Sequence, residues 1–221
     1  MGLSLELAQV SKVYNGQEIL RDCSWVFEEG LTQVIMGLNG TGKSTLLRIC
    51  ALLEAPDRGQ ASYLAGGRPL APDLELRRRL TLLLPSVGVF NTSVFHNVAY
   101  GLKIRGVPRR EIEQRVMAIL EVVGLAAKRR QRALDLSTGQ AKRLGLARAM
   151  VLEPEVILLD EPTASIDQEN SQIIEGIIKE MKAERKATII MVTHDPAQAE
   201  RLGDRILLMQ NGKLEPAAAG P

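Results

Sequence analysis

The sequence predicts an α/β fold built around a parallel sheet. Two apolar runs, 156–159 and 188–192, show no polar alternation, as expected of central strands that are covered on both faces. Apolar residues recur at helical spacing between them, which gives the strand–helix–strand order of a parallel sheet. A third apolar run, 33–36, ends in Gly37 and leads into a helical stretch at 43–53, so the same order is found near the start of the chain.

An antiparallel hairpin is expected to open the chain. Leucines alternate with polar residues over 3–10, which is the period of a half-buried strand, and Asn15-Gly16 supplies a tight turn. Proline and glycine become frequent over 54–73, which predicts loops around one short strand near 61–64.

Helices are expected in two further regions. A mostly helical insert is predicted over 86–150, where Pro108 suits the first turn of a helix and Gly124 suits its end. The helix between the two apolar strands is predicted to be capped by Ser165 or Asp167. Its buried stripe is predicted to consist of Ile173, Ile174, Ile177 and Met181.

The last part of the chain is predicted to hold a short helix and a hairpin. Asp195 can cap the helix, because its carboxylate can accept hydrogen bonds from backbone N–H groups of the first turn. A strand at 205–209 then precedes Asn211-Gly212, a pair typical of two-residue hairpin turns. Residues 216–221 are expected to be a frayed tail.

Composition restricts the class of protein. The 221 residues are 45% hydrophobic and 24% charged, which is typical of globular proteins and not of disordered or collagenous chains. The net charge of +2 is too small to indicate a nucleic-acid partner. Cys23 and Cys50 lack metal-type spacing and are expected to be reduced, buried thiols. Because no apolar run is long enough to span a bilayer and no signal peptide is evident, we expect a cytoplasmic protein.

The clearest motif is a glycine-rich loop between the first predicted parallel strand and its helix. Glycines allow backbone N–H groups to converge on phosphate oxygens, and the start of the following helix presents the positive end of its dipole to the same anion. Lys43 adds a positive charge between the β- and γ-phosphates, and the Ser44 hydroxyl is a ligand for magnesium. The residues predicted to bind the nucleotide here are Gly37, Leu38, Asn39, Gly40, Thr41, Gly42, Lys43, Ser44 and Thr45.

Three polar residues follow the other two predicted parallel strands. Because ligands bind at the carboxyl ends of parallel strands, Asp160, Glu161 and His194 are expected at the same sheet edge as the loop. Asp160 is predicted to hold magnesium, and Glu161 to orient or deprotonate the attacking water. His194 is predicted to hydrogen-bond the γ-phosphate or that water. The simpler alternatives are a pair of acids at a helix start and a surface or core histidine.

The segment 136–140, Leu-Ser-Thr-Gly-Gln, closely resembles the LSGGQ signature of the ATP-binding cassette (ABC) family. With the glycine-rich loop, the acidic pair, the histidine and a D-loop-like segment that ends in Asp167, the resemblance covers nearly the whole chain. It implies that Ser137, Gly139, Gln140 and Asp167 contact ATP held by the loop of a second copy. A helix start that carries Ser137 and the Gly139 N–H group is a reasonable second anion site.

The resemblance also implies an architecture. It is that of an ABC ATPase, with a P-loop NTPase (RecA-like) core, an antiparallel β subdomain and a helical subdomain. The expected boundaries are 1–215 for a single ABC ATPase domain, about 1–85 and 151–215 for the core, and about 86–150 for the helical subdomain.

By the same resemblance, the chain is expected to be an ATP-hydrolysing subunit with ATP and Mg²⁺ as cofactors. Two copies are expected to pair head to tail around ATP and to drive transmembrane permease subunits from the inner face of the cell membrane. Tyr14 matches the aromatic residue that stacks on adenine, although it could instead be a core aromatic. The single cassette is similar to bacterial or archaeal importers, including those of tungstate or related oxyanions, while amino-acid and phosphate importers also fit. The alternative is a soluble ABC ATPase in a cytoplasmic assembly, such as iron–sulfur cluster loading.

The sequence departs from the family pattern at two positions. Pro85 stands where members usually carry a glutamine that contacts magnesium and the attacking water, and a proline side chain cannot make such a contact. Thr138 replaces a signature glycine, for which we expect at most a modest weakening of the dimer. The segment 89–98 resembles the surface that receives the permease's coupling helix, although its apolar residues could also be plain core.

Overall fold

The computed structural model describes residues 2–184 and 187–217. The chain divides into two compact units, which are described separately below. Unit 1 comprises Met1–Leu82, Glu155–Glu161 and Met181–Pro221, and unit 2 comprises Leu83–Pro154 and Pro162–Glu180. This division differs from the expected boundaries because residues 162–180 group with the helical unit and not with the core.

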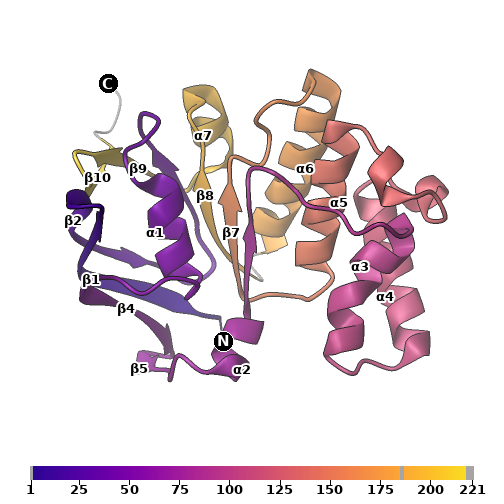
Figure 1. The fold of residues 1–221 in the computed structure, drawn as a ribbon, viewed down its shortest axis with the longest axis horizontal. Helices are drawn as coiled ribbons and strands as arrows, with labels where there is room; N and C mark the ends of the chain where they lie inside the picture. The colour runs from indigo at the N-terminus through magenta and orange to yellow at the C-terminus, as the bar shows by residue number, and fades with distance from the viewer. Residues whose placement is uncertain (1, 185–186, 218–221) are drawn as a thin grey trace. The chain divides into compact units, whose positions relative to one another are not determined.

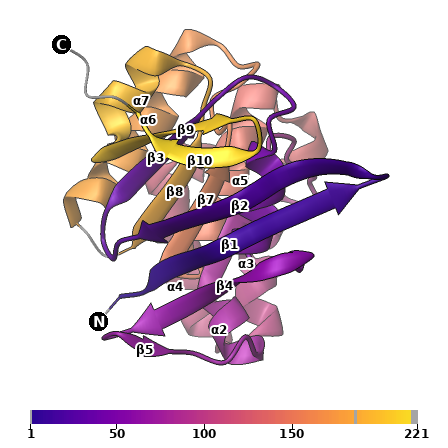
Figure 2. The same cartoon turned by 90° about the vertical axis from the view of Figure 1, so that its left-hand side faces the viewer.

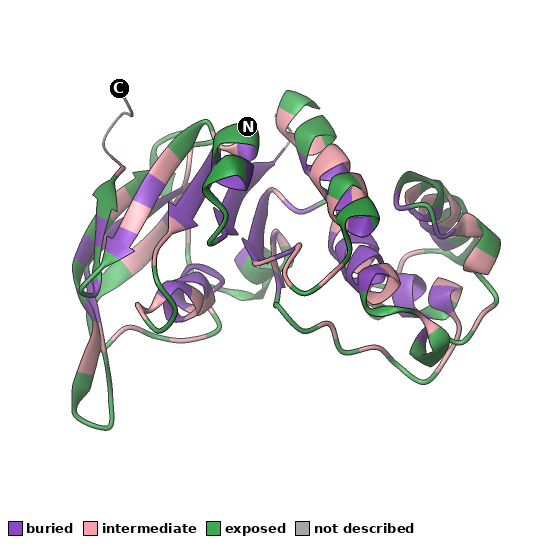
Figure 3. Ribbon diagram, turned by 90° about the horizontal axis from the view of Figure 1, so that it is seen from above, coloured by how far each residue is buried: buried purple, intermediate pink, exposed green. Residues whose placement is uncertain are grey.

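A six-stranded sheet forms the centre of unit 1 (Figure 1). The three central strands pair in parallel, with Asp160 opposite Val192 at one end of the β7–β8 pair. They are buried along nearly their whole length, which explains their lack of polar alternation (Figure 3). In sheet order, the strands are β10 (Lys213–Pro216), β9 (Arg205–Gln210), β3 (Thr32–Met36), β8 (Thr188–Val192), β7 (Val156–Asp160) and β6 (Leu80–Leu83).

A four-stranded antiparallel sheet also belongs to unit 1 (Figure 2). The predicted opening hairpin is confirmed, with Asn15 and Gly16 at φ +51° and +79° between its two long strands. In sheet order, the strands are β2 (Gln17–Phe27), β1 (Ser4–Tyr14), β4 (Arg58–Ala65) and β5 (Arg68–Pro69).

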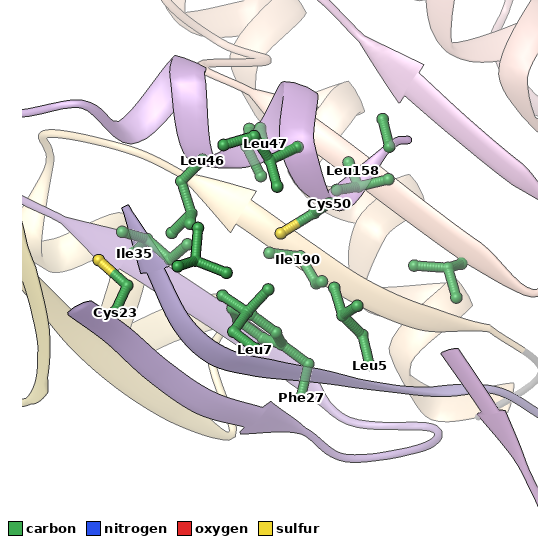
Figure 4. Packing of buried hydrophobic residues seen from close by; sticks show 14 of the residues in the cluster. Leu5, Leu7, Cys23, Phe27, Ile35, Leu46, Leu47, Cys50, Leu158 and Ile190 are labelled. Carbon is green, nitrogen blue, oxygen red and sulfur yellow. The ribbon is translucent and has the colours of Figure 1, made fainter. Parts of the chain in front are cut away.

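Helix α1 (Lys43–Cys50) lies between the two sheets and joins their cores (Figure 4). Leucines and Phe27 of the antiparallel sheet meet leucines of α1 and the inner faces of β3, β7 and β8 there. Both cysteines are free and buried, as predicted, and burial raises the pKa of the Cys50 thiol. The remaining helices of unit 1 are α2 (Leu74–Arg78) and α7 (Pro196–Leu202).

Unit 2 is helical, and α3 packs against both α4 and α5. Its α4 is followed by Gly124 at φ +66°, which is the left-handed conformation that commonly ends a helix. Helix α6 begins in unit 2 and ends in unit 1. The elements are α3 (Val94–Ile104), α4 (Arg109–Val122), η1 (Ala126–Lys128), η2 (Ala133–Asp135), α5 (Thr138–Met150) and α6 (Gln168–Glu184).

Several predicted boundaries are wrong. Helix α1 ends before residue 53, because Leu52 adopts φ +56°, and the short strand near 61–64 is the longer β4. The predicted frayed tail is wrong at Pro216, which ends β10, and the Ala217 N–H donates to Ile206 O at 2.9 Å. Residues 218–221 of that tail lie outside the described residues.

The N-terminal caps of the last two helices, α6 and α7, follow the prediction in part. Asp167, and not Ser165, caps α6, since its carboxylate accepts the Asn170 N–H at 2.8 Å. Asp195 caps α7 by accepting from the N–H groups of Ala197 and Gln198 at 2.9 and 3.2 Å. Two of the four residues of the predicted α6 stripe, Ile174 and Ile177, are buried together with Ile178, while Ile173 and Met181 are only half-buried.

Candidate nucleotide-binding site

The carboxyl ends of β3, β7 and β8 meet at one edge of the sheet in unit 1. Gly37 directly follows β3, Asp160 ends β7, and His194 lies two residues beyond β8. The Glu161 N–H donates to Val192 O at 3.0 Å, which fixes the turn after β7 against the end of β8. The parallel register therefore brings these predicted residues to one place.

The glycines of the loop are required by backbone geometry and space. Gly37 has φ +152°, and a Cβ there would collide with Met209 O. Gly42 has φ +102°, and a Cβ there would lie 2.8 Å from Leu20 Cδ2. Since L-residues rarely adopt such angles and no room exists for a side chain, glycine keeps the loop close to β9 and β2.

Lys43 is folded back over the loop. Its Nζ donates to Gly37 O at 2.8 Å and to Leu38 O at 2.7 Å, and the residue is 6% exposed. Burial lowers the pKa of the Lys43 ammonium group, and the negative charges of Glu161 and Asp160 oppose this. The cation therefore lies at the loop, where a bound phosphate could replace the carbonyl oxygens as its partner.

Asp160 and Ser44 place two oxygen ligands together. Asp160 is 2% exposed; burial raises the pKa of its carboxyl group, while a hydrogen bond from the Ser44 hydroxyl lowers it. A carboxylate beside a hydroxyl suits Mg²⁺, which prefers oxygen ligands and usually binds to few protein groups. In the part of the chain that the structure describes, no cluster of three or more acidic, His or Cys side chains could hold a metal ion. An ion at Asp160 would therefore need further oxygens from a nucleotide.

Glu161 and His194 face the same open space. His194 Nδ1 lies 3.4 Å from Glu161 Oε1, and the two side chains are 63% and 23% exposed. Glu161 has φ +48°, an uncommon conformation for a residue other than glycine. Both residues line a cavity of about 680 Å³, together with the glycine-rich loop and the β9–β10 turn. The arrangement can hold a water molecule and accept its proton.

Tyr14 lines a smaller hollow of about 290 Å³ at the loop, with Ile19 and Glu161. It is 37% exposed, so the alternative that Tyr14 fills the core is wrong. Its hydroxyl donates to Glu54 Oε1. The ring is therefore available for stacking at the loop, although its role with adenine stays a prediction.

In unit 2, the predicted signature begins helix α5. Ser137 and Gln140 form a capping box: the Gln140 N–H donates to Ser137 Oγ, and the Ser137 N–H donates to Gln140 Oε1, both at 3.3 Å. Ser137 and Thr138 are exposed, whereas Gly139 is buried. The Gln140 side chain is engaged by its own helix, and the exposed Thr138 is the first residue of α5.

Asp167 is fixed beside this helix start by Asn170, a residue that the motifs did not indicate. Besides the backbone contact, Asn170 Nδ2 donates to both oxygens of Asp167, at 2.9 and 2.7 Å. These hydrogen bonds, led by the backbone N–H, lower the pKa of Asp167. A Cβ on Gly139 would lie 2.5 Å from Asn170 Nδ2, so Asn170 is the reason for the glycine.

The two other segments singled out in the sequence also lie in unit 2. Pro85 is exposed just after β6, and its effect on coupling stays a prediction. Of the apolar residues in 89–98 that were expected to line a groove, Val89 and Phe95 are half-buried and Phe90 is exposed, while Val94 and Val98 are buried. Phe90 remains 39% exposed and packs against Tyr100, with ring centroids 4.6 Å apart and the ring planes tilted by 47°.

Comparisons with known proteins identify the family. The family profile described as ABC transporter matches residues 20–164. The tungstate uptake system ATP-binding protein TupC of Peptoclostridium acidaminophilum is 36% identical over 96% of this chain and 97% of its own length. The methionine import ATP-binding protein MetN 1 of Listeria monocytogenes is 37% identical over 95% of this chain. The spermidine/putrescine import ATP-binding protein PotA of Vibrio cholerae is 35% identical over 96%.

The likeness extends to a solved structure. That of cbiO1 from Clostridium perfringens, part of the ABC transporter complex cbiONQ, gives a TM-score of 0.85 at 28% identity over 97% of this chain and 87% of that one. The chain spans only 64% of the methionine relative and 56% of the polyamine relative. No helix in the described ranges is long and apolar enough to cross a membrane. The chain therefore belongs to the ABC transporter family and has the fold of its ATP-binding proteins.

Proposed function

We propose that this chain is the ATPase subunit of a membrane importer and that two copies close head to tail around ATP. The observation that carries the proposal is the meeting of Lys43, Ser44, Asp160, Glu161 and His194 at one sheet edge beside a glycine-rich loop. The relatives described above are all transporter components, which does not favour the alternative of a cytoplasmic iron–sulfur assembly ATPase.

In the proposed reaction, water attacks the γ-phosphorus while the bond from that phosphorus to the β–γ bridging oxygen breaks. Glu161 accepts a proton from the water, and His194 holds the water or a γ-phosphate oxygen. The loop N–H groups and Lys43 stabilise the charge on the phosphates, and the products are ADP and inorganic phosphate. The separation of 3.4 Å between Glu161 and His194 allows one water molecule to contact both.

Magnesium fits the site through Ser44 and Asp160, and it would supply positive charge to the β- and γ-phosphates. The protein's part is to hold the two oxygens together. The hydrogen bond between them and the burial of Asp160 achieve this before any ion binds.

The proposed dimer uses the second anion site in unit 2. Ser137 is exposed at the start of α5, and the capping box holds that helix start in place. In the closed dimer, Ser137, Gly139, Gln140 and Asp167 would contact ATP bound by the partner copy. Only the closed state then satisfies the γ-phosphate from both sides, so ATP binding favours closure.

The proposed partners are transmembrane permease subunits, contacted from the inner face of the cell membrane through the 89–98 segment. Tungstate or a related oxyanion is the proposed cargo, because the tungstate relative matches this chain along nearly its full length. Uptake of tungstate, with methionine and spermidine as controls, in cells that lack and regain this chain would test the cargo. Loss of methionine or spermidine uptake alone would contradict it.

Phosphate release from ATP tests the reaction. The wild-type chain should hydrolyse ATP only with Mg²⁺, and Glu161→Gln should lower the rate at least about 100-fold while ATP binding is retained. Glu28→Gln is a matched control. Glu28 forms a half-exposed ion pair with Arg205, with an N–O distance of 2.6 Å, and this pair is not part of the glycine-rich loop. Equal rates for Glu161→Gln and the control would refute the role of Glu161.

A further inference from the structure

Glu54 lies four residues beyond α1 and joins three side chains near the glycine-rich loop. Its Oε1 accepts from the Tyr14 hydroxyl and lies 3.3 Å from Lys12 Nζ. Its Oε2 accepts from Arg48 Nε at 3.4 Å. The Glu54 side chain is 22% exposed, so these contacts are partly shielded from water. The hydrogen bond from Tyr14, followed by contacts with Lys12 and Arg48, lowers the pKa of Glu54 and keeps it ionised.

The contacts of Glu54 determine how the Tyr14 ring is presented. Tyr14 ends β1 at the surface, where an exposed aromatic side chain would otherwise change rotamer freely. Lys12 Nζ lies over the ring, 5.6 Å from its centroid, and is itself held by Ala55 O at 2.9 Å and Asp57 Oδ1 at 3.2 Å. A cation on one face leaves the opposite face for a base.

Arg48 extends the network to the loop helix. Its Nη2 donates to Thr45 Oγ1 at 3.2 Å, and Thr45 is 6% exposed in the first turn of α1. Thr45 lines the same hollow as Tyr14. Glu54 thus connects the aromatic side chain at one end of the hollow with the helix that follows the glycine-rich loop at the other.

We propose that Glu54 is a positioning residue for the nucleobase. It holds the Tyr14 ring beside the loop, so that the ring can contact the base of a purine nucleoside triphosphate while the loop binds the phosphates. This inference rests on the proposed function, since it assumes that ATP binds at the loop. Glu54 contacts the base end of the site directly through Tyr14, and it reaches the phosphate end only indirectly, through Arg48 and Thr45. The Tyr14 hydroxyl, and not only its ring, then contributes to ATP affinity.

The test compares ligands with and without a base. Dissociation constants for Mg-ATP and Mg-tripolyphosphate are measured by calorimetry on the full chain, for Glu54→Ala, Glu54→Gln, Tyr14→Phe and the control Glu28→Gln. Because stacking on an aromatic residue contributes to the affinity for a base, partial loss of ring alignment should weaken ATP binding by about five- to tenfold in Glu54→Ala and Tyr14→Phe. Glu54→Gln, which can still accept from Tyr14, should lose about threefold.

Tripolyphosphate affinity should stay within about twofold of wild type in every variant. The double variant Glu54→Ala/Tyr14→Phe should bind ATP no more weakly than either single one, because both remove the same contact. ATP affinity unchanged in Glu54→Ala, or an equal loss for both ligands, would overturn the role of Glu54 while leaving the proposed function intact. Failure of the wild-type chain to bind ATP would overturn both. The stoichiometry of binding and the thermal midpoint without ligand show whether each variant is folded.

Discussion

The replacement Gly139→Ala tests how tightly the start of α5 packs against α6. The new Cβ would lie 2.5 Å from Asn170 Nδ2 and 2.7 Å from Asn170 Cβ, and closer still to Asn170 Cγ. The Asn170 side chain cannot swing away freely, because its amide donates twice to Asp167. Overpacking of this kind lowers the free energy of unfolding by about 1–3 kcal/mol.

Gly176→Ala is the matched control in α6. Among the described residues, no atom outside the helix's own backbone lies within 4 Å of a Cβ at position 176, and Gly176 does not have a positive φ. Alanine there should raise the free energy of unfolding by about 0.5–1 kcal/mol, since it limits the unfolded chain and favours helix. The same chemical change is therefore expected to have opposite signs at the two glycines.

Urea unfolding of the nucleotide-free chain, followed by circular dichroism, measures both effects. Asn170→Ala should partly rescue Gly139→Ala, with a coupling of about 1 kcal/mol, because it removes the amide but leaves a Cβ at 2.7 Å. Equal stability of Gly139→Ala and Gly176→Ala would show that the new Cβ meets no obstacle at Asn170, and simple addition of the effects of Gly139→Ala and Asn170→Ala would show the same.

Two further predictions concern charges in unit 1. The raised pKa of buried Asp160 means that the folded state binds its proton more tightly than the unfolded state, so stability falls as pH rises from the unfolded value of 3.8 through the folded value. Asp160→Asn should therefore stabilise the nucleotide-free chain at pH 7. In urea titrations across pH, this gain should shrink as the pH falls through the folded pKa and should be lost below 3.8; a destabilised variant at pH 7 would contradict this. Arg79→Ala should lower the free energy of unfolding by about 1 kcal/mol, since Arg79 makes two hydrogen bonds of 2.6 and 2.7 Å to a partly exposed Glu155, and no measurable loss would show that solvent screens the pair.

The strands and the loop were predictable because their signals are local and strong. The apolar runs at β7 and β8 and the glycines at 37 and 42 each have one simple structural explanation, namely burial on both faces and positive φ. Parallel pairing then places Asp160, Glu161 and His194 together without any further information.

Other elements depend on contacts that a sequence does not display. Helix α2 has only five residues, and it begins directly after the 54–73 region of predicted loops, with a cap at Asp73. Helix α1 stops early because of the conformation of Leu52, a residue type that rarely adopts positive φ. The partner of Tyr14 is Glu54, which is 40 residues away, and no spacing pattern links them.

Sedimentation of Glu161→Gln with and without saturating ATP and Mg²⁺ tests the central claim most directly. We expect this hydrolysis-deficient chain to be a monomer without nucleotide and a dimer with it, because ATP would join the loop of one copy to the α5 start of the other. Adding Ser137→Glu, which places a negative charge at that helix start, should restore the monomer. A Glu161→Gln chain that stays monomeric with ATP, or a dimer that Ser137→Glu does not disrupt, would contradict the account.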